Sequence, residues 1–381
     1  MPRVMLVQPG ARHNYALARF LARQDMLQRV YTDFALGTGH RLRGVLSLPL
    51  PSRLKDKLSR RATDVLPARL IRSGLGVTLP GLGPRTLRRP SQRDIVESDG
   101  FYLQYYAGGA DLRARAPHKP IISDVFIVPG AYRAIDREVA DFPDWGERPT
   151  PPKLIDRYDT HSRTMFEESD LLFCPSQAVI DDVATYGAQF ADKCRLVPYG
   201  ASLSSAGGIP EPGRVLFCGS LHLRKGVQYI RAAADMLSDS HPHIRFVFAG
   251  GASAIMRAKL AAPNIDLLGH LGKAELLREF GRADLFLFPS LAEGAAGAVL
   301  EAMASGLPIV ATREGGVDFT DGTSGIVLPP RDAEAIAAAV VRIVEDRDLR
   351  AALSAGATRE AEIYSMAAWE ARFIAAVSNV F

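Results

Sequence analysis

Hydrophobic residues in the second half of the chain recur in two alternating patterns. Short apolar runs predict buried strands, and between them apolar residues return every three or four positions, as they do along amphipathic helices. Five strands are predicted in this way: Val215 to Phe217, Ile244 to Ala249, Ile265 to Leu268, Leu285 to Phe288 and Ile309 to Thr312. The helices between them include Lys273 to Phe280 and Gly297 to Ala304. Such alternation is typical of a doubly wound parallel sheet with crossover helices.

The first half of the chain shows the same alternation less regularly. A strand is predicted at Val4 to Val7, followed by a helix at Ala16 to Leu27. Three later strands are predicted: Phe101 to Leu103, Ile121 to Ile122 and Leu171 to Phe173. Residues 199–213 are rich in Gly, Ser and Pro and have no periodicity, which marks them as a linker. The pattern therefore predicts two α/β domains, over residues 1–198 and 199–359.

The composition agrees with two domains that each bury a core. The chain has 381 residues, of which 47% are hydrophobic and 23% charged. No run of 18 or more apolar residues occurs without a charge or a breaker, so we expect no transmembrane helix. The three cysteines, Cys174, Cys194 and Cys218, are too widely spaced for a disulfide framework or a zinc site. These features predict a cytoplasmic protein.

A basic segment interrupts the first half. Residues 41–93 contain 13 Lys and Arg against two acidic residues, a net charge of +11 in a chain whose total is +4. Such a block predicts an anionic partner or surface. Within it, four apolar residues fall at i, i+4, i+8 and i+11 and predict an amphipathic basic helix: Leu54, Leu58, Ala62 and Val65. Two interpretations of this helix agree equally well with the pattern: a solvated flap on the surface and a contact with an anionic membrane.

Two familiar nucleotide-binding motifs are missing, since no G-x-G-x-x-G follows a predicted strand and no G-x-x-x-x-G-K-[ST] occurs. A different pattern follows the strand at 285–288, where Glu293 and Glu301 are separated by seven residues across a turn into a helix. Both carboxylates then face one crevice at the carboxyl edge of the sheet. The helix start at Gly297 offers free N–H groups to an anion, and carboxylates accept hydrogen bonds from sugar hydroxyls.

Positive charge is needed at the same edge, because two carboxylates alone would repel a diphosphate. The loop from Gly219 to Gly226 follows the strand at 215–217 and carries Arg224 and Lys225. Both cations are therefore expected at the carboxyl edge of the same sheet. A diphosphate flanked by hydroxyl-bearing groups describes a nucleotide sugar.

The order of motifs from residue 197 onward resembles the family 4 retaining glycosyltransferases, which are group 1 glycosyltransferases of the GT-B fold. The matching segments are 197–200, 219–226, 248–251, 268–271, 283–290, the Glu293/Glu301 pair and 301–308. The resemblance implies two Rossmann-like doubly wound domains that face each other across a cleft. It places the donor on the C-terminal domain and the acceptor on the N-terminal domain, and it implies that residues 360–381 cross back to the first domain.

The resemblance also assigns roles to individual residues. It places Lys225 at the donor phosphates, Glu301 at the ribose hydroxyls and Glu293 at the transferred sugar. The remaining donor-binding positions would be Arg224, Ser220, Gly219, Gly250, Gly269, Gly294 and Gly297. At Ser220 the sequence departs from the family, because many members carry there an arginine that contacts the diphosphate. That role shifts to Lys225 and Arg224.

The acceptor side departs further from the family. A histidine is usual after the strand at 121–122, and this sequence has Ser123 and Asp124 instead. Asp124, or His13 in the loop after the first strand, is the candidate substitute, since both residue types can accept a proton. A turn carboxylate that caps a helix, and a histidine that bonds a loop carbonyl, are the alternative interpretations.

We predict that the protein transfers a sugar from a UDP- or GDP-linked donor to a glycan or lipid-linked acceptor, with retention, in cell-surface polysaccharide or glycolipid synthesis. The alternatives are a non-catalytic nucleotide-sugar-binding protein and a GT-B nucleotide-sugar epimerase. Asp346-Arg347-Asp348 resembles the metal motif of the other major transferase fold but ends a predicted helix, so no metal or other cofactor is expected. We expect no nucleic-acid partner, and segment 41–93 leaves open a peripheral position on the inner face of the cell membrane.

Overall fold

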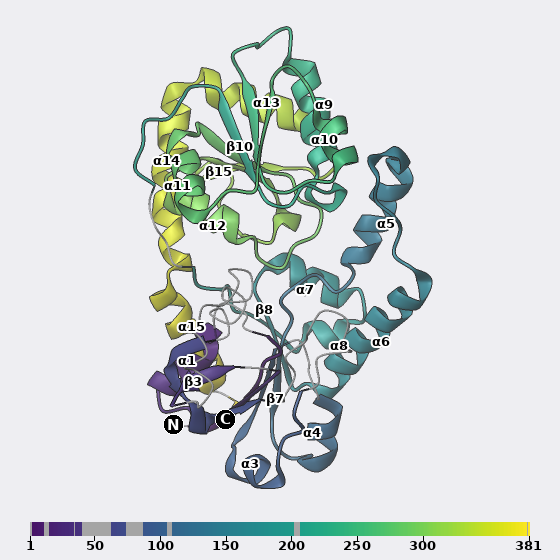
Figure 1. Ribbon diagram of the computed structural model, residues 1–381, viewed down its shortest axis with the longest axis vertical. Coiled ribbons are helices and arrows are strands. Elements are labelled where there is room, and N and C mark those ends of the chain that lie inside the picture. Colours follow the sequence, from purple (N-terminus) through teal and green to yellow (C-terminus); the bar gives the residue numbers. More distant parts are fainter. Residues whose placement is uncertain are drawn as a thin grey trace, which may run out of the picture.

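The chain is described by a computed structural model that covers residues 2–10, 15–33, 35–39, 62–73, 87–104, 109–201, 206–378 and 380–381. Two sheets with helices packed around them lie one above the other (Figure 1). Within the described residues the N-terminal sheet has seven strands in the order β5-β2-β1-β6-β7-β8-β9, all paired in parallel. They are β1 (Val4–Val7), β2 (Leu27–Thr32), β5 (Ile71–Ser73), β6 (Gly100–Gln104), β7 (Ile121–Asp124), β8 (Leu171–Cys174) and β9 (Cys194–Leu196).

Helices of the first half of the chain connect these strands. They are α1 (Ala16–Arg23), α3 (Gln92–Glu97), α4 (Gly109–Arg115), α5 (Ala131–Asp141), α6 (Pro152–Glu168), α7 (Gln177–Ala184) and α8 (Ala188–Ala191), with short turns η3 (Ala68–Leu70) and η4 (Pro143–Trp145). A separate parallel pair joins β3 (Leu36–Thr38) to β4 (Ala62–Pro67).

The first helix is shorter than predicted. α1 ends at Arg23, and Leu27 is the first residue of β2, so the predicted helix from Ala16 to Leu27 was wrong at its end. Asp25 adopts a left-handed conformation with a φ of 54°, which stops the helix and turns the chain into the strand. Leu27 is buried as a strand residue rather than on a helix face.

The predicted basic helix was also wrong where it can be compared with the structure. Ala62 and Val65 lie in β4, which pairs in parallel with β3. β-branched residues such as Thr63 and Val65 favour a strand, and pairing with β3 provides the backbone hydrogen bonds that the helix would otherwise form. Leu54 and Leu58 lie outside the described residues.

The C-terminal sheet confirms the predicted doubly wound arrangement. In the described part of this half it has six parallel strands in the order β12-β11-β10-β13-β14-β15. The strands are β10 (Arg214–Cys218), β11 (Arg245–Ala249), β12 (Ile265–Gly269), β13 (Leu285–Phe288), β14 (Ile309–Thr312) and β15 (Gly325–Leu328). The helices are α9 (Val227–Leu237), α10 (Ala254–Leu260), α11 (Lys273–Arg282), α12 (Gly297–Ala304), α13 (Ala333–Glu345) and α14 (Arg347–Ala361), with turns η5 (Leu223–Lys225), η6 (Arg313–Gly315) and η7 (Glu362–Tyr364).

The last helix, α15 (Met366–Ser378), returns to the N-terminal sheet (Figure 1). Trp369 and Phe373 are buried in the same apolar cluster as β1 and α1. The ring of Phe20 lies 5.4 Å from that of Trp369 and 5.8 Å from that of Phe373, between ring centroids. Such aromatic contacts stabilise packing beyond the apolar area that they bury, so α15 fastens the end of the chain to the first half.

Helix α5 makes a second crossing, in the opposite direction, that the sequence did not predict. It rises toward the C-terminal half (Figure 1), where it contacts η5, and its Val139 belongs to the apolar core of that half. Glu138 is fully buried there. Its carboxylate accepts hydrogen bonds from Gln228 Nε2 at 2.7 Å and Tyr229 Oη at 2.8 Å, and it pairs with Arg331 Nε at 2.6 Å. The segment around α5 is therefore anchored in the C-terminal core.

The carboxyl edges of the two sheets meet at the loop after β13. Ser176 Oγ, at the start of α7, donates to the Gly294 carbonyl at 2.7 Å. A Cβ at residue 294 would overlap the carbonyl oxygen of Phe126, in the loop after β7, so only glycine allows this approach. The edge that carries the predicted donor residues therefore faces the N-terminal half directly.

We expect Glu138→Ala to lower the free energy of unfolding by about 3 to 5 kcal/mol, because it leaves the Arg331 guanidinium without its buried counter-charge. Urea unfolding measures the change. Asp141→Ala is the matched control on the same helix, since its carboxylate is about half exposed and its substitution is expected to change stability by less than about 0.5 kcal/mol. Equal effects of the two substitutions would show that the α5 crossing does not stabilise the fold.

Candidate functional site

A cavity of about 540 Å³ lies between the two halves and brings residues from both to one place. The C-terminal half contributes Gly297, Leu300 and Glu301 from α12. The N-terminal half contributes Asp124 from the end of β7 and Arg19 from α1, and Tyr199 lies in the segment that joins the halves. The predicted site residues Glu301, Gly297 and Asp124 therefore share one cleft.

Glu293 is the centre of the charged cluster next to this cleft. Its Oε1 atom contacts both Arg224 and Lys225, and Ser290 Oγ donates to the same oxygen at 3.2 Å. Side-chain exposure is only 13% for Glu293 and 12% for Lys225, so the pairs are shielded from solvent. Two cations share one carboxylate, which leaves one positive charge uncompensated within the cluster.

Lys225 contacts an aromatic ring in addition to the Glu293 carboxylate. Its Nζ atom lies 4.9 Å from the centre of the Phe288 ring, a cation–π contact at the end of β13. Burial lowers the pKa of Lys225, and the Glu293 carboxylate acts against that shift. The Glu293 carboxylate thus favours the charged form of the half-buried Lys225.

The neighbouring histidine carries no charge at neutral pH. Burial, together with Arg224 and Lys225, lowers the pKa of His222 to about 4. Glu147, from the segment after α5, accepts a hydrogen bond from the Leu223 backbone N–H at 2.7 Å. Burial raises the pKa of Glu147. The turn η5 that carries both cations is therefore supported from the N-terminal half.

Glu301 lies on α12 with its carboxylate toward the cleft. It is half-buried, and no hydrogen bond to its carboxylate occurs among the described residues. Desolvation raises its pKa. Burial and the nearby Glu301 raise the pKa of Cys218, at the end of β10, to about 11. Glu301 is thus a carboxylate held at the sheet edge and available to a ligand.

The predicted glycines have different surroundings. Gly250 approaches the Gly219 carbonyl so closely that a Cβ at residue 250 would overlap it. Gly297 begins α12 and faces open space, and Gly269 also faces open space with a φ of 71°. Gly294, described above, lies against the first half instead of lining the cavity. Ser220 is exposed in the loop after β10.

Asp124 is a buried polar residue of the N-terminal half. It is 1% exposed at the end of β7, and Tyr199 Oη donates to its Oδ1 atom at 2.5 Å. This hydroxyl is a partner that sequence analysis missed, because the two residues are 75 positions apart and only the fold brings them together. His13 lies outside the described residues.

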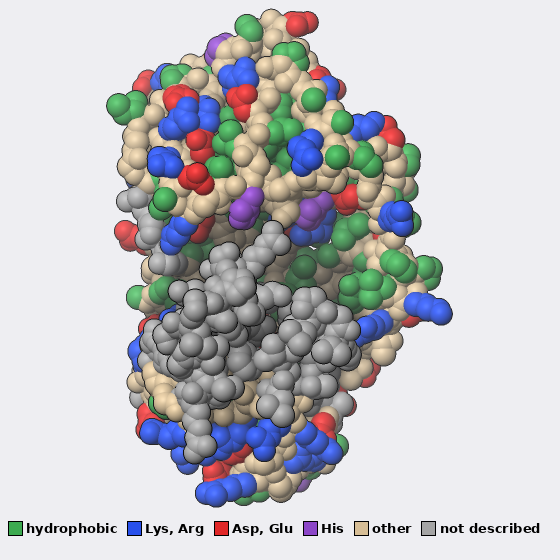
Figure 2. Space-filling model, viewed as in Figure 1, with side chains coloured by type: hydrophobic (Ala, Val, Ile, Leu, Met, Phe, Trp, Pro, Cys, Tyr) green, Lys and Arg blue, Asp and Glu red, His purple; other side chains and the backbone are tan. Residues whose placement is uncertain are grey.

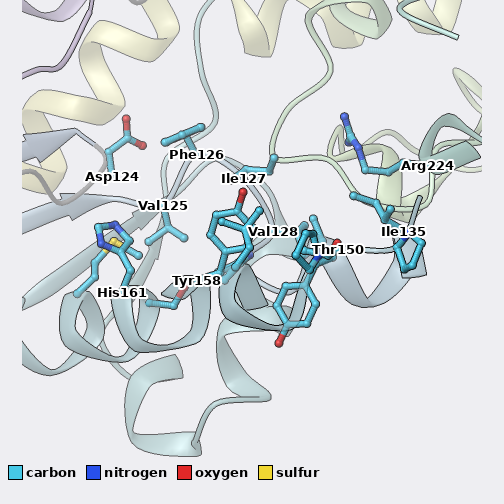
Figure 3. Close-up of a pocket in the computed structure, with 18 of the residues that line it drawn as sticks. Asp124, Val125, Phe126, Ile127, Val128, Ile135, Thr150, Tyr158, His161 and Arg224 are labelled. Atoms are coloured by element: carbon cyan, nitrogen blue, oxygen red, sulfur yellow. The ribbon is translucent and has the colours of Figure 1, made fainter. Parts of the chain in front are cut away.

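A second cavity, also of about 540 Å³, extends from the same region into the N-terminal half. Figure 3 shows Asp124 and His161 at one end and Arg224 and Ile135 at the other, with Val125, Val128 and Tyr158 between them. Asp124 therefore lines both cavities. Sequence analysis missed this cavity because its walls come from the loop after β7 and from α5 and α6, which carry no chemical motif.

Two further predictions concern metals and membranes. Asp346 caps α14 by accepting a hydrogen bond from the Leu349 N–H at 2.9 Å, which agrees with a helix-end role for the Asp346-Arg347-Asp348 motif. In the ranges that the structure describes, no group of three or more His, Cys, Asp or Glu side chains is placed to hold a metal ion. Within the same ranges, no helix has the length and hydrophobicity needed to cross a membrane.

Comparison with known families identifies the C-terminal half. Residues 212–346 match the family described as Glycosyl transferases group 1. Three similar proteins are the sulfoquinovosyl transferase SQD2 of Arabidopsis thaliana, a D-inositol 3-phosphate glycosyltransferase of Corynebacterium urealyticum and the glycogen synthase of Mycobacterium tuberculosis. Their identities are 27, 33 and 31%, over 53, 43 and 56% of this chain. The matched regions span 43, 42 and 50% of those proteins, about half of their length or less.

Solved structures match over the whole chain. Anabaena HepE, in a complex with UDP and glucose, aligns with a TM-score of 0.63 at 16% identity and full coverage of both chains. Sucrose-phosphate synthase from Thermosynechococcus elongatus aligns with a TM-score of 0.66 at 15% identity, over 100% of this chain and 99% of that one. Residues 212–346 therefore match the group 1 glycosyltransferase family, and the whole chain has the GT-B fold, in which two α/β domains face each other.

Proposed function

We propose that this protein transfers a sugar from a UDP- or GDP-linked donor to an acceptor, with retention of configuration, in the synthesis of a cell-surface polysaccharide or glycolipid. One observation carries the proposal: Arg224 and Lys225 share the Glu293 carboxylate at the sheet edge where Glu301 faces the cleft. Cations for a diphosphate and carboxylates for sugar hydroxyls are thus adjacent in a group 1 domain. HepE, whose fold matches, was solved with UDP and glucose.

The donor would lie along the carboxyl edge of the C-terminal sheet. The diphosphate would take Lys225 and Arg224 as partners, next to the start of α12 at Gly297. The Glu301 carboxylate would accept hydrogen bonds from the ribose hydroxyls, and Glu293 would turn toward the transferred sugar once the phosphates engage its cations. We propose no metal ion for this step, because two side-chain cations can stabilise the departing diphosphate.

The transfer step needs only groups that donor, acceptor and protein supply. The bond between the sugar C1 and the phosphate oxygen breaks, and its electron pair leaves with the diphosphate. The acceptor oxygen forms the new bond to C1 on the same face and gives its proton to the departing diphosphate. Asp124, held by Tyr199 at the edge of the cleft, would orient that acceptor hydroxyl.

The non-catalytic binder and the nucleotide-sugar epimerase remain the alternatives, because the N-terminal histidine of the family is replaced here. Nucleoside diphosphate release distinguishes the three. A transferase releases it faster when an acceptor is added, an epimerase changes the donor sugar without an acceptor, and a binder does neither.

We expect Lys225→Ala and Glu301→Ala each to weaken binding of UDP or GDP, whichever the wild type binds. Loss of a hydrogen bond to a charged group costs about 1.5 to 3 kcal/mol, or roughly 10- to 150-fold in affinity. Calorimetry measures the change. Lys259→Ala and Glu275→Ala are the matched controls on neighbouring helices, and wild-type affinity in the two site variants would refute the assignment.

We also propose that the net charge of +11 in residues 41–93 brings the protein to an anionic membrane surface. We expect binding to vesicles that contain anionic lipid, with little binding to neutral ones, and a loss of binding as salt rises. Replacing Lys55, Lys57, Arg60 and Arg61 by glutamine should weaken sedimentation with anionic vesicles. Glutamine at four exposed arginines of the other half, Arg257, Arg278, Arg342 and Arg359, should not. Equal sedimentation with neutral vesicles would contradict a membrane role.

A further inference from the structure

Most side chains that line the cavity in the N-terminal half are apolar or aromatic, and its polar lining residues are Asp124, Arg148, Thr150, His161, Ser162 and Arg224. The loop after β7 contributes Val125, Phe126, Ile127 and Val128, and α6 contributes Leu154 and Met165. Hydrophobic side chains also gather on the surface between α5 and α6 (Figure 2). We call this cavity of about 540 Å³, lined by these residues together with Ile135, Arg148 and Tyr158, the apolar cavity.

The apolar cavity is open to solvent and not a void in the core. Tyr158 in its wall is 39% exposed, and Phe126, Ile127 and Val128 are only half-buried. Exposed apolar surface in a concave wall loses contact with water when an apolar ligand enters, which favours binding. A site of this size and lining suits a small molecule with a substantial apolar part.

Exposed positive charge in the wall of the apolar cavity, and on the helix α6 that contributes to this wall, favours an anion. Arg148 lines the cavity and is exposed, with no ion-pair partner in the described parts of the chain. Lys153 and Arg157 are exposed on the first turns of α6, against a single exposed acid there, Asp156. Asp136, the nearest acid on α5, already accepts a hydrogen bond from the Thr150 N–H at 2.7 Å.

The apolar cavity lies next to the proposed reaction site. Asp124 lines both this cavity and the interdomain cleft, and Arg224, which contacts Glu293, lies at its other end (Figure 3). A ligand that fills the apolar cavity would therefore reach the interdomain cleft at Asp124 and the cations of the proposed donor site at Arg224.

We propose that the apolar cavity is the acceptor subsite and that the acceptor is an amphiphile, with an apolar chain in the cavity and an anionic group at Arg148. The acceptor hydroxyl then lies where the cavity meets the cleft, at Asp124. This proposal rests on the proposed transferase function and selects the lipid-linked class of acceptor over a free glycan, which offers no apolar chain to these walls.

Calorimetry with farnesyl phosphate, a short soluble amphiphile of this kind, tests the proposal on the full chain. We expect saturable binding to one site per chain. Leu154→Trp fills the cavity and should weaken binding of farnesyl phosphate at least about tenfold. Tyr158→Glu, at an exposed position of the cavity wall, should also weaken this binding and replaces Leu154→Trp if that variant does not fold. Arg148→Ala should weaken the binding of farnesyl phosphate but leave the binding of farnesol, which lacks the phosphate, unchanged. Val96→Trp, on α3 at a position 66% exposed, is the control for an added indole ring.

Nucleotide binding, measured in the same variants, separates this proposal from the proposed function. Two results would overturn the amphiphile subsite and leave the proposed transferase function standing. One is farnesyl phosphate binding that neither Leu154→Trp nor Tyr158→Glu changes. The other is the absence of farnesyl phosphate binding in a protein that binds UDP or GDP. Loss of oligosaccharide binding in Leu154→Trp, with farnesyl phosphate unaffected, would also overturn it, in favour of a glycan acceptor. If neither UDP nor GDP binds the wild type, the proposed function fails, and the subsite loses its role as an acceptor site.

Discussion

The rest of the site depends on one interaction, the pairing of the Glu293 carboxylate with both Arg224 and Lys225. Burial disfavours a charged lysine, and the Glu293 carboxylate opposes that effect. His222 adds no charge at neutral pH, so the cluster carries one net positive charge. Such a cluster is preorganised for an anion, because the cations are in place before the ligand arrives.

The elements that hold this cluster come from both halves of the chain. Glu147 accepts from the backbone of η5, which carries the two cations, and Glu138 fixes α5 against Gln228 and Arg331 of the C-terminal half. In the other direction, α15 packs Trp369 and Phe373 onto the N-terminal core. Movement between the halves must therefore bend the chain on either side of α5 and α15 as well as in the linker.

Local patterns predicted the C-terminal sheet and much of its edge. The runs at 285–288 and 309–312 are buried on both faces of a parallel sheet, so hydrophobicity alone marked their ends, and both match the observed strands. The Glu293/Glu301 spacing placed two carboxylates near one crevice for the same local reason. The spacing did not predict that Glu293 pairs with Arg224 and Lys225. This pairing depends on the directions of side chains that are about 70 residues apart in the sequence.

Features made by long-range packing could not be predicted in this way. The burial of Glu138 and the Tyr199–Asp124 hydrogen bond join residues more than 70 positions apart, and each side chain taken alone is an ordinary polar residue. At Leu27 and Ala62, helix-like spacing of apolar residues coincided with strands, because pairing with β1 and with β3, and not periodicity, decided the conformation of these segments.

In our proposal, Glu293 offsets one of the two positive charges of Arg224 and Lys225 until a diphosphate takes its place. Calorimetric titration of UDP and GDP into wild type and Glu293→Gln tests this most directly. Removing the competing carboxylate should tighten binding of the free nucleoside diphosphate by about tenfold, equivalent to about 1.4 kcal/mol, while transfer from the sugar donor falls. Weaker binding of the nucleoside diphosphate to Glu293→Gln than to wild type would contradict the account.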